Sequence, residues 1–187
     1  MRQWPAAGKR FAGLGLLALL LILGPGGYGC GYHLRPTGEN IGKDIKKIFV
    51  ASFANNTPEA NIETSFRNAF IDQFIKGRRF QIVNAEGLAD AVLKGEIRNL
   101  VVAPLAYRGD SNLAVEKRIT VTLSLTLEAK GTPAALWHEE SFAQWGDYAL
   151  DSNNLSAAAV QASQKNALSK LADDVAERAY RIMITDF

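Results

Sequence analysis

The stretch "VEKRITVTLSLTLE", residues 115–128, decides the fold, because its side chains alternate between apolar and polar. From Ile119 onward the odd positions carry Ile, Val and Leu, and only Lys117 interrupts the apolar series before that. An alternation with a period of two is typical of a β-strand that buries one face and exposes the other. The polar face consists of Thr120, Thr122, Ser124, Thr126 and Glu128. We therefore expect one long strand here, with a polar sheet face open to water or to a partner protein.

The segments on either side of this stretch also have the pattern of long strands. "AVLKGEIRNLVVAPLAY" (91–107) alternates at first, and its register then shifts near Leu100–Val102, which predicts a bulge or bend. After the turn "KGTP" (130–133), "ALWHEESFAQWGDY" (135–148) returns as a further strand. Because the connections are short, these strands are expected to form an antiparallel meander.

Two segments have the apolar spacing of amphipathic helices. Residues 59–76 repeat apolar side chains every three or four positions, with Pro58 expected in the first turn and Gly77 at the end. Residues 155–184 form a second apolar stripe, preceded by the capping sequence "DSNN". Shorter strands are expected at 46–53 and 79–83. The fold class that follows is α+β, with two helices packed on one face of a small mixed, mainly antiparallel sheet.

The N-terminal region has the layout of an export signal. Three cations, Arg2, Lys9 and Arg10, precede the apolar run "LGLLALLLIL" (14–23), which is too short for an ordinary membrane-spanning helix. We expect residues 1–29 to be a lipoprotein signal peptide, 30–45 a lipid anchor and lead-in, and 46–187 a single domain. The alternative is an apolar run that stays uncleaved as a membrane anchor.

The chain has a single cysteine, Cys30, directly after the expected signal peptide. A lone cysteine in an exported protein indicates an intermolecular bond or a modified thiol, and this position favours lipid attachment to Cys30. Gly29 fits the lipoprotein pattern, whereas Gly27 and Tyr28 depart from it, so cleavage that leaves a free thiol is the alternative. Lipids on Cys30 would hold the domain on the periplasmic side of the outer membrane, in its inner leaflet.

Composition and motifs exclude several function classes. Without the three cations of residues 1–29 the chain has 18 basic and 19 acidic residues, so its net charge is −1 and nucleic acid is not an expected partner. His33 and His138 with one cysteine make no metal set, and no cofactor motif is present. A dyad of His138 with a carboxylate beside Ser141 has nothing to orient it. We therefore expect no enzymatic activity, no cofactor and no metal.

Cations gather at one end of the expected sheet. Arg108, Lys117 and Arg118 flank the hairpin between the strands at 91–107 and 115–128. Arginine suits the phosphate oxygens of anionic ligands, although a hairpin end with solvated cations is the plain alternative. Tyr107, Trp145 and Tyr148 are candidate anchors for a protein partner, and core packing is the alternative for them.

Several of these segments resemble the LPS-assembly lipoprotein LptE family across essentially the whole exported chain. The segments are "CGYHL" (30–34), "IFVASFANNTPEANIE" (48–63), "ADAVLKGEI" (89–97) and "ALWHEESF" (135–142) followed by "DY" (147–148). The resemblance implies an outer-membrane lipoprotein with two helices on a small mixed sheet. It also implies that the lipoprotein sits as a plug inside the large β-barrel LptD and helps this barrel to assemble. The two proteins together insert lipopolysaccharide into the outer leaflet.

The resemblance assigns expected roles to particular residues. It implies direct binding of lipopolysaccharide near a strand-end loop, where Arg108 matches best and Lys117 less well, and a second basic position after the last strand is absent from "YALDSNN" (148–154). The face of Thr120, Thr122, Ser124 and Thr126 suits contact with a polar barrel interior.

A second family also resembles one segment of the chain. "FANNT" (53–57) is similar to a strand and turn in outer-membrane lipoproteins that regulate a peptidoglycan synthase. Such regulators usually carry a long disordered linker, whereas about 15 residues separate Cys30 from the first expected strand, which gives little reach.

Overall fold

The computed structural model describes residues 44–109, 113–132, 135–151 and 153–185. Cys30, the expected signal peptide and most of the expected lead-in lie outside the described residues. The elements follow in the order β1 (Lys47–Val50), β2 (Ala54–Asn55), α2 (Ile62–Gly77), β3 (Gln81–Ile82), the 3-10 turn η1 (Glu86–Leu88), β4 (Ala91–Tyr107), β5 (Ala114–Ala129), β6 (Ala135–Ala149) and α3 (Ala157–Thr185).

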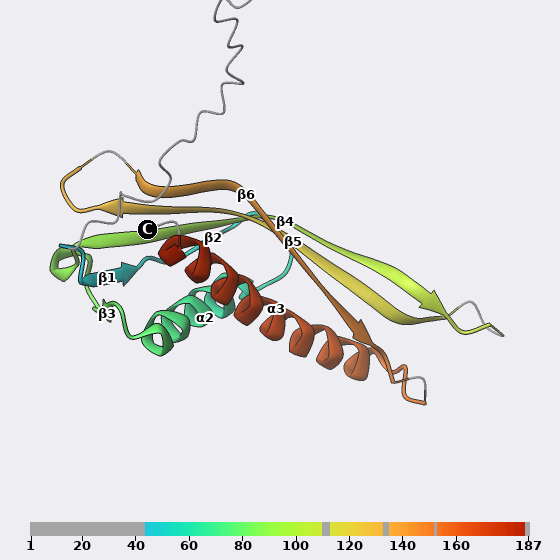
Figure 1. The fold of residues 1–187 in the computed structure, drawn as a ribbon. Helices are drawn as coiled ribbons and strands as arrows, with labels where there is room; N and C mark the ends of the chain where they lie inside the picture. Colours follow the sequence, from blue (N-terminus) through green and yellow to red (C-terminus); the bar gives the residue numbers. More distant parts are fainter. Residues whose placement is uncertain (1–43, 110–112, 133–134, 152, 186–187) are drawn as a thin grey trace, which may run out of the picture. The chain divides into compact units, whose positions relative to one another are not determined.

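The strands form one mixed sheet in the order β3-β1-β4-β5-β6, and β2 pairs with β4. The short strands pair in parallel, β1 with β3 and β4 and β2 with β4, whereas the three long strands pair antiparallel. Both helices cover one face of this sheet (Figure 1). The expected α+β fold is therefore confirmed, although the strand expected at 46–53 is shorter, Lys47–Val50, and a separate strand follows it at Ala54–Asn55.

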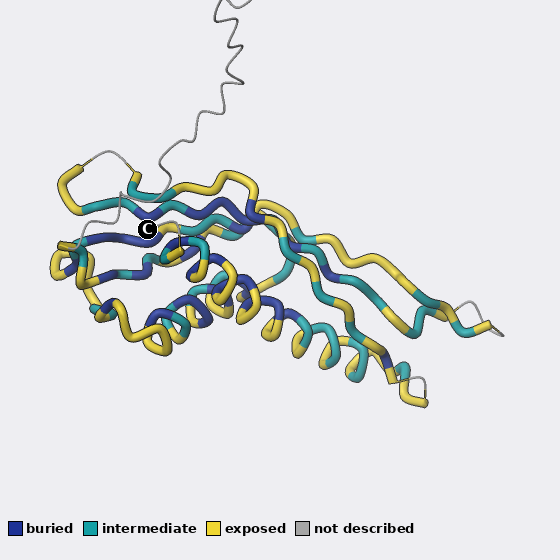
Figure 2. The backbone as a smooth tube through the Cα atoms, in the orientation of Figure 1, coloured by how far each residue is buried: buried dark blue, intermediate teal, exposed yellow. Residues whose placement is uncertain are grey.

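The apolar positions of β5 form the centre of the core, as their alternation predicted. Ile119, Val121, Leu123, Leu125 and Leu127 are fully buried. They face a row of phenylalanines on α2, Phe66, Phe70 and Phe74, and the apolar stripe of α3. Figure 2 shows the buried stretches in dark blue along the strands and along the helices. We call the side of the sheet that faces the helices the helix side, and the opposite side the outer face.

The helix ends differ from the sequence prediction. Helix α2 begins at Ile62 rather than near Pro58, because Asn55 Oδ1 accepts hydrogen bonds from the backbone N–H and the hydroxyl of Thr57 and holds that segment in a turn. Helix α3 is preceded by Ser156, whose Oγ accepts a hydrogen bond from the N–H of Ala159, so the cap is this serine and not the expected residues 151–154.

A bulge divides β4 into two parts. Ile97 pairs with Leu123 and Asn99 pairs with Thr122, so Arg98 is the extra residue. The bulge or bend had been expected near Leu100–Val102, two to four positions later in the strand. We call Ala91–Ile97 of β4, with Leu123–Ala129 of β5, the covered half of the sheet, and Asn99–Tyr107, with Ala114–Thr122, the distal half.

The two halves have different neighbours. In the covered half, β1 and β2 lie beside β4, and the ring of Phe53 packs directly over Gly95, where a side chain would collide with it. In the distal half, β4 pairs with β5 alone among the described strands, whereas α3 runs along β6 on the other side of β5 (Figure 1). Nearly all side chains of β4 beyond the bulge are consequently exposed.

Candidate functional site on the outer face of the sheet

The polar side chains of β5 line the middle of the outer face. Thr120, Thr122 and Thr126 are half-buried, whereas Ser124 retains only 8% of its exposure. Ser124 lies opposite Glu96 of β4, and on its other side β6 is displaced by a second bulge between the pairs Leu123–Phe142 and Leu125–Glu139. Of the four expected partner-surface residues, the three threonines are therefore accessible and Ser124 is not.

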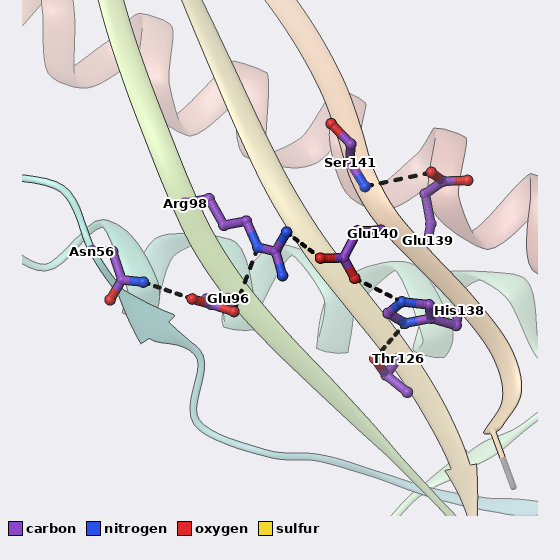
Figure 3. Close-up of polar contacts among 8 residues, drawn as sticks. All are labelled: Asn56, Glu96, Arg98, Thr126, His138, Glu139, Glu140 and Ser141. Atoms are coloured by element: carbon purple, nitrogen blue, oxygen red, sulfur yellow. Dashed lines mark hydrogen bonds and ion pairs between the residues drawn. The ribbon is translucent and has the colours of Figure 1, made fainter.

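A chain of hydrogen bonds and ion pairs crosses the outer face beside these threonines (Figure 3). Asn56 Nδ2 donates to Glu96 Oε1 at 2.6 Å, and Glu96 Oε2 lies 3.6 Å from Arg98 Nε. Arg98 also pairs with Glu140 of β6. Arg98 follows buried Ile97 and therefore points to the outer face, where its guanidinium joins β4 to β6 across β5.

The network continues along β6 to His138. Glu140 Oε2 lies 3.0 Å from His138 Nε2, and His138 Nδ1 lies 2.9 Å from Thr126 Oγ1. The hydrogen bond from Arg98, with a smaller contribution from His138, holds the pKa of Glu140 below its ordinary value. Glu140 therefore stays ionised at neutral pH, and the outer face carries fixed charges that compensate one another.

A second charged group lies in the distal half. Arg118 donates from Nε and Nη2 to the two carboxylate oxygens of Asp147, at 2.7 and 2.8 Å, and its guanidinium stacks 4.0 Å from the ring centre of Trp145. This two-pronged contact lowers the pKa of Asp147. Trp145 is still 53% exposed. Arg118 thus organises an aromatic surface on the outer face, and its charge is matched by Asp147.

The three hairpin cations do not share one face. Alternation along β5 places Lys117 on the helix side, opposite Pro104 and Tyr148, and Arg118 on the outer face. Arg108 lies at the hairpin end, where its backbone N–H donates to the carbonyl of Leu113 at 2.8 Å. The expected convergence of Arg108, Lys117 and Arg118 into one cluster is therefore limited, because two of them point to opposite sides of the sheet.

The aromatic candidates have different environments. Tyr107 and Trp145 are exposed, as anchors for a partner would be. Tyr148 is half-buried on the helix side, and its hydroxyl has no hydrogen-bond partner among the described residues. Burial raises the pKa of Tyr148, and nearby Glu59 adds to the effect. Tyr148 is therefore a packing residue of the β6–α3 contact.

The described residues contain no group of three metal-ligating side chains. His138 directs its two ring nitrogens to Glu140 and Thr126, and the backbone of Ser141 contacts Glu139 instead (Figure 3). The histidine is thus part of the polar network, and its two ring nitrogens contact Glu140 and Thr126 rather than Ser141. In the part of the chain that the structure describes, no helix has the length and apolar character needed to span a membrane.

Sequence reasoning identified the threonine face and missed the networks beside it. Arg98, Glu96 and Glu140 come from strands whose relative register depends on two bulges, and alternation alone does not locate a bulge. Arg118 and Asp147 are cross-strand partners, so their pairing could have been found only by fixing the register of β5 against β6.

Similar folds occur in solved structures. The crystal structure of the rare lipoprotein B from Shewanella oneidensis aligns with a TM-score of 0.51 at 13% identity, covering 75% of this chain and 95% of that one. A PelC dodecamer from Paraburkholderia phytofirmans aligns with a TM-score of 0.50 at 16% identity, covering 78% and 93%. At such identities the likeness concerns the fold alone. Among curated proteins, none matches the sequence.

The match to a family description is more extensive. The family described as "LptE: Lipopolysaccharide-assembly" matches residues 45–183, which include every strand of the sheet, helix α2 and all but the end of α3. A match over this share of the chain, together with the observed fold, shows that the protein belongs to the LptE family of lipopolysaccharide-assembly proteins.

Proposed function

We propose that this protein is an outer-membrane lipoprotein that occupies the interior of an LptD-type β-barrel, helps that barrel to assemble, and thereby supports insertion of lipopolysaccharide into the outer leaflet. Membership of the LptE family is the observation that carries the proposal. Lipids on Cys30 would hold the protein on the periplasmic side of the membrane, in its inner leaflet.

The outer face has the chemistry that a barrel interior requires. Barrel interiors are largely polar, so a plug must present hydrogen-bonding groups and compensated charges. The outer face offers half-buried threonine hydroxyls, the Arg98–Glu140 pair and the Arg118–Asp147 pair. The helix side has its apolar side chains buried under α2 and α3. We therefore place the sheet and its hairpin in the lumen, and the two helices nearer the periplasm.

Binding of lipopolysaccharide forms the second part of the proposal. Arg108 lies at the open end of the hairpin, where the phosphates of a passing glycolipid would meet its guanidinium. Lys117 supports this charge from the helix side of the hairpin. Arg118 acts less directly in this proposal, because its Nε and Nη2 already donate to the carboxylate of Asp147.

Co-purification tests the barrel partnership. The full-length chain with a C-terminal tag is expressed in a Gram-negative host, solubilised in mild detergent and recovered, and the co-purified proteins are identified. A large outer-membrane barrel in about equal amount supports the proposal. A peptidoglycan synthase in its place would favour the alternative suggested by residues 53–57, and absence of any stable partner would contradict both.

Two matched variants show which surface makes the contact. Thr122→Arg places a long cation in the middle of the outer face, and Ser169→Arg makes a similar change on the exposed surface of α3. We expect Thr122→Arg to reduce the recovered barrel about tenfold and Ser169→Arg to leave it unchanged. Equal recovery with both variants would remove the outer face from the interface.

Binding of the glycolipid is tested separately with purified lipopolysaccharide. Arg108→Glu is expected to weaken its binding to the full-length protein about tenfold, and Lys165→Glu, on the exposed surface of α3, to leave it unchanged. If both variants bind like the parent protein, the hairpin end is not the contact site, whatever the result with the barrel.

A further inference from the structure

We propose that the open edge of β4 between Asn99 and Pro104 accepts an extended segment of the barrel partner as an additional strand of the sheet. This inference rests on the proposed function for the identity of the partner. Three features of the distal half support it. They are backbone groups of β4 without a strand partner, exposed apolar side chains, and the charges at the two ends of the run.

The first observation is the change of neighbours along β4. In the covered half the carbonyl oxygens of Leu93 and Ile97 accept hydrogen bonds from Ala51 and Asn56, so the side of β4 away from β5 is satisfied there. From Asn99 to Pro104 the strand keeps an unbroken register with β5, Asn99 opposite Thr122 and Pro104 opposite Lys117. Among the described strands, none pairs with its other side.

The ladder geometry shows which backbone groups are directed outward. In an antiparallel pair, alternate residues direct their N–H and C=O groups toward the partner strand. The bulge at Arg98 sets this alternation so that Asn99, Val101 and Ala103 face β5, whereas Leu100, Val102 and Pro104 face the open edge. Pro104 is consistent with this assignment, because a proline is tolerated in a strand where its nitrogen faces away from the ladder.

The side chains from Asn99 to Ala103 lack the charges that commonly protect an exposed edge, and Pro104 blocks pairing only at the end of this run. Natural edge strands carry charges, especially lysine, that prevent pairing with another chain. The run from Asn99 to Tyr107 contains no charged residue, and its exposed apolar side chains Val101, Val102, Leu105 and Tyr107 retain 37–57% of their exposure. The other sheet edge is guarded differently, since Arg178 of α3 donates to the carbonyl of Ala143 and to Gln144 on β6.

Unpaired backbone donors and acceptors select an extended polypeptide over a lipid, because acyl chains offer no hydrogen bonds. Charge selects against a second copy of this chain. The antiparallel register that pairs the whole run 99–107 with itself sets Arg98 opposite the Arg108 of the other copy at both ends, and like charges directly opposite are destabilising. A complementary segment is uncharged in its centre and carries carboxylates toward its ends.

The kind of segment follows from the architecture of a barrel. Strands in the barrel wall are already paired on both sides, so they have no free groups to offer. The occupant is therefore an extended loop or terminal segment of the barrel protein that enters the lumen beside the plug. The added segment would lie beside the distal part of β4, on the side away from β5, and the order of the existing strands would not change.

Hydrogen exchange of the full-length protein, alone and in its complex with the barrel, gives a direct test. We expect the amides of Leu100 and Val102 to exchange at least about tenfold more slowly in the complex, whereas those of Val101 and Ala103 change little because β5 already binds them. Unchanged exchange at Leu100 and Val102 in a complex that has formed would overturn the inference and leave the proposed function standing.

Two variants at one position separate backbone pairing from side-chain contact. Val102→Pro removes only the edge-directed N–H, whereas Val102→Thr keeps that donor and the branched shape. We expect Val102→Pro to lower barrel recovery about fivefold and Val102→Thr to stay within twofold of the parent. Equal recovery with both variants contradicts strand addition.

Two further outcomes would change the occupant. If lipopolysaccharide alone slows the exchange of Leu100 and Val102, the occupant is a lipid. If the parent protein recovers no barrel, the occupant and the proposed function are both overturned.

Discussion

The covered and distal halves of the sheet are made from the same two strands, and only their neighbours differ. In the covered half, β4 has strands on both sides and helices beneath, and its inward side chains are fully buried. Beyond Arg98 the same strand has β5 on one side, and most of its side chains are exposed. The comparison separates residues that hold the fold together from residues that are free to contact something else.

Each half has its own means of cohesion. Apolar burial dominates the covered half, where Leu123, Leu125 and Leu127 of β5 join the inward side chains of β4 in one core, and it reaches into the distal half through Ile119 and Val121 of β5. In the distal half, antiparallel pairing is supplemented by the Arg118–Asp147 contact and by stacking on Trp145. We therefore expect substitutions in β4 to affect stability strongly before the bulge and weakly after it.

The largest difference is expected from shortening one apolar side chain in each half. Leu123→Ala removes a fully buried side chain beside the bulge and should lower the free energy of unfolding by about 3 kcal/mol. Val101→Ala, at an exposed position, should change it by about 0.5 kcal/mol or less. Urea unfolding of the full-length protein in detergent measures both values. Similar losses would mean that the distal half is packed as tightly as the covered one.

Adding one methyl group in place of a glycine tests the packing from the opposite direction. In Gly95→Ala the new carbon would lie 2.5 Å from the ring of Phe53, so a loss of about 2 kcal/mol is expected. Gly146→Ala, in β6 opposite the distal part of β5, meets only Leu171 at 3.7 Å, an ordinary contact. Thermal melting should show a lower Tm for the first variant alone, and a stable Gly95→Ala would mean that Phe53 is free to move aside.

Proline at two adjacent positions distinguishes the two sides of the distal strand. Val101→Pro removes an N–H that faces β5 and should cost about 1 kcal/mol more than Val102→Pro, whose missing N–H faces the open edge. The same urea titration measures this difference in the absence of the barrel. A larger loss for Val102→Pro would reverse the assignment of which residues face outward.

The smallest effect concerns acid sensitivity in the distal half. Arg118 lowers the pKa of Asp147 in the folded protein, so their contact stabilises the fold at and above the ordinary carboxyl value of 3.8. That contribution is lost as the pH falls below this value and through the lowered folded pKa. Asp147→Asn should therefore show a shallower fall in Tm on acidification, whereas Asp173→Asn on exposed α3 should follow the parent. Parallel pH profiles for the parent and Asp147→Asn would exclude this coupling.

The sequence was sufficient for the elements that a strong periodicity specifies. The alternation of residues 119–127 predicted β5 and its buried face, and the apolar spacing of Phe66, Phe70 and Phe74 predicted α2 and its packing side. The same alternation predicted that Thr120, Thr122 and Thr126 lie on the opposite face, where they are half-buried, and their contact with a partner stays a prediction.

Features that depend on register were not predictable in the same way. A bulge at Arg98 rather than two to four residues later decides which later side chains reach the outer face, and local propensity does not distinguish these positions. The turn around Thr57 displaced the start of α2, because a side-chain hydrogen bond from Asn55 overrode a favourable proline position. Arg118 was expected to be a ligand contact, and only the pairing of β5 with β6 reveals its carboxylate partner.

The bulge at Arg98 adds one side chain to the outer face without changing the pairing on either side of it. Because Arg98 is supernumerary, Ile97 and Asn99 occupy successive positions of the ladder with β5, so deleting Arg98 would remove one guanidinium from the outer face and leave the pairs from Asn99–Thr122 to Pro104–Lys117 in place. A one-residue deletion at this position would therefore change the charge of the outer face while keeping the register of the packed centre.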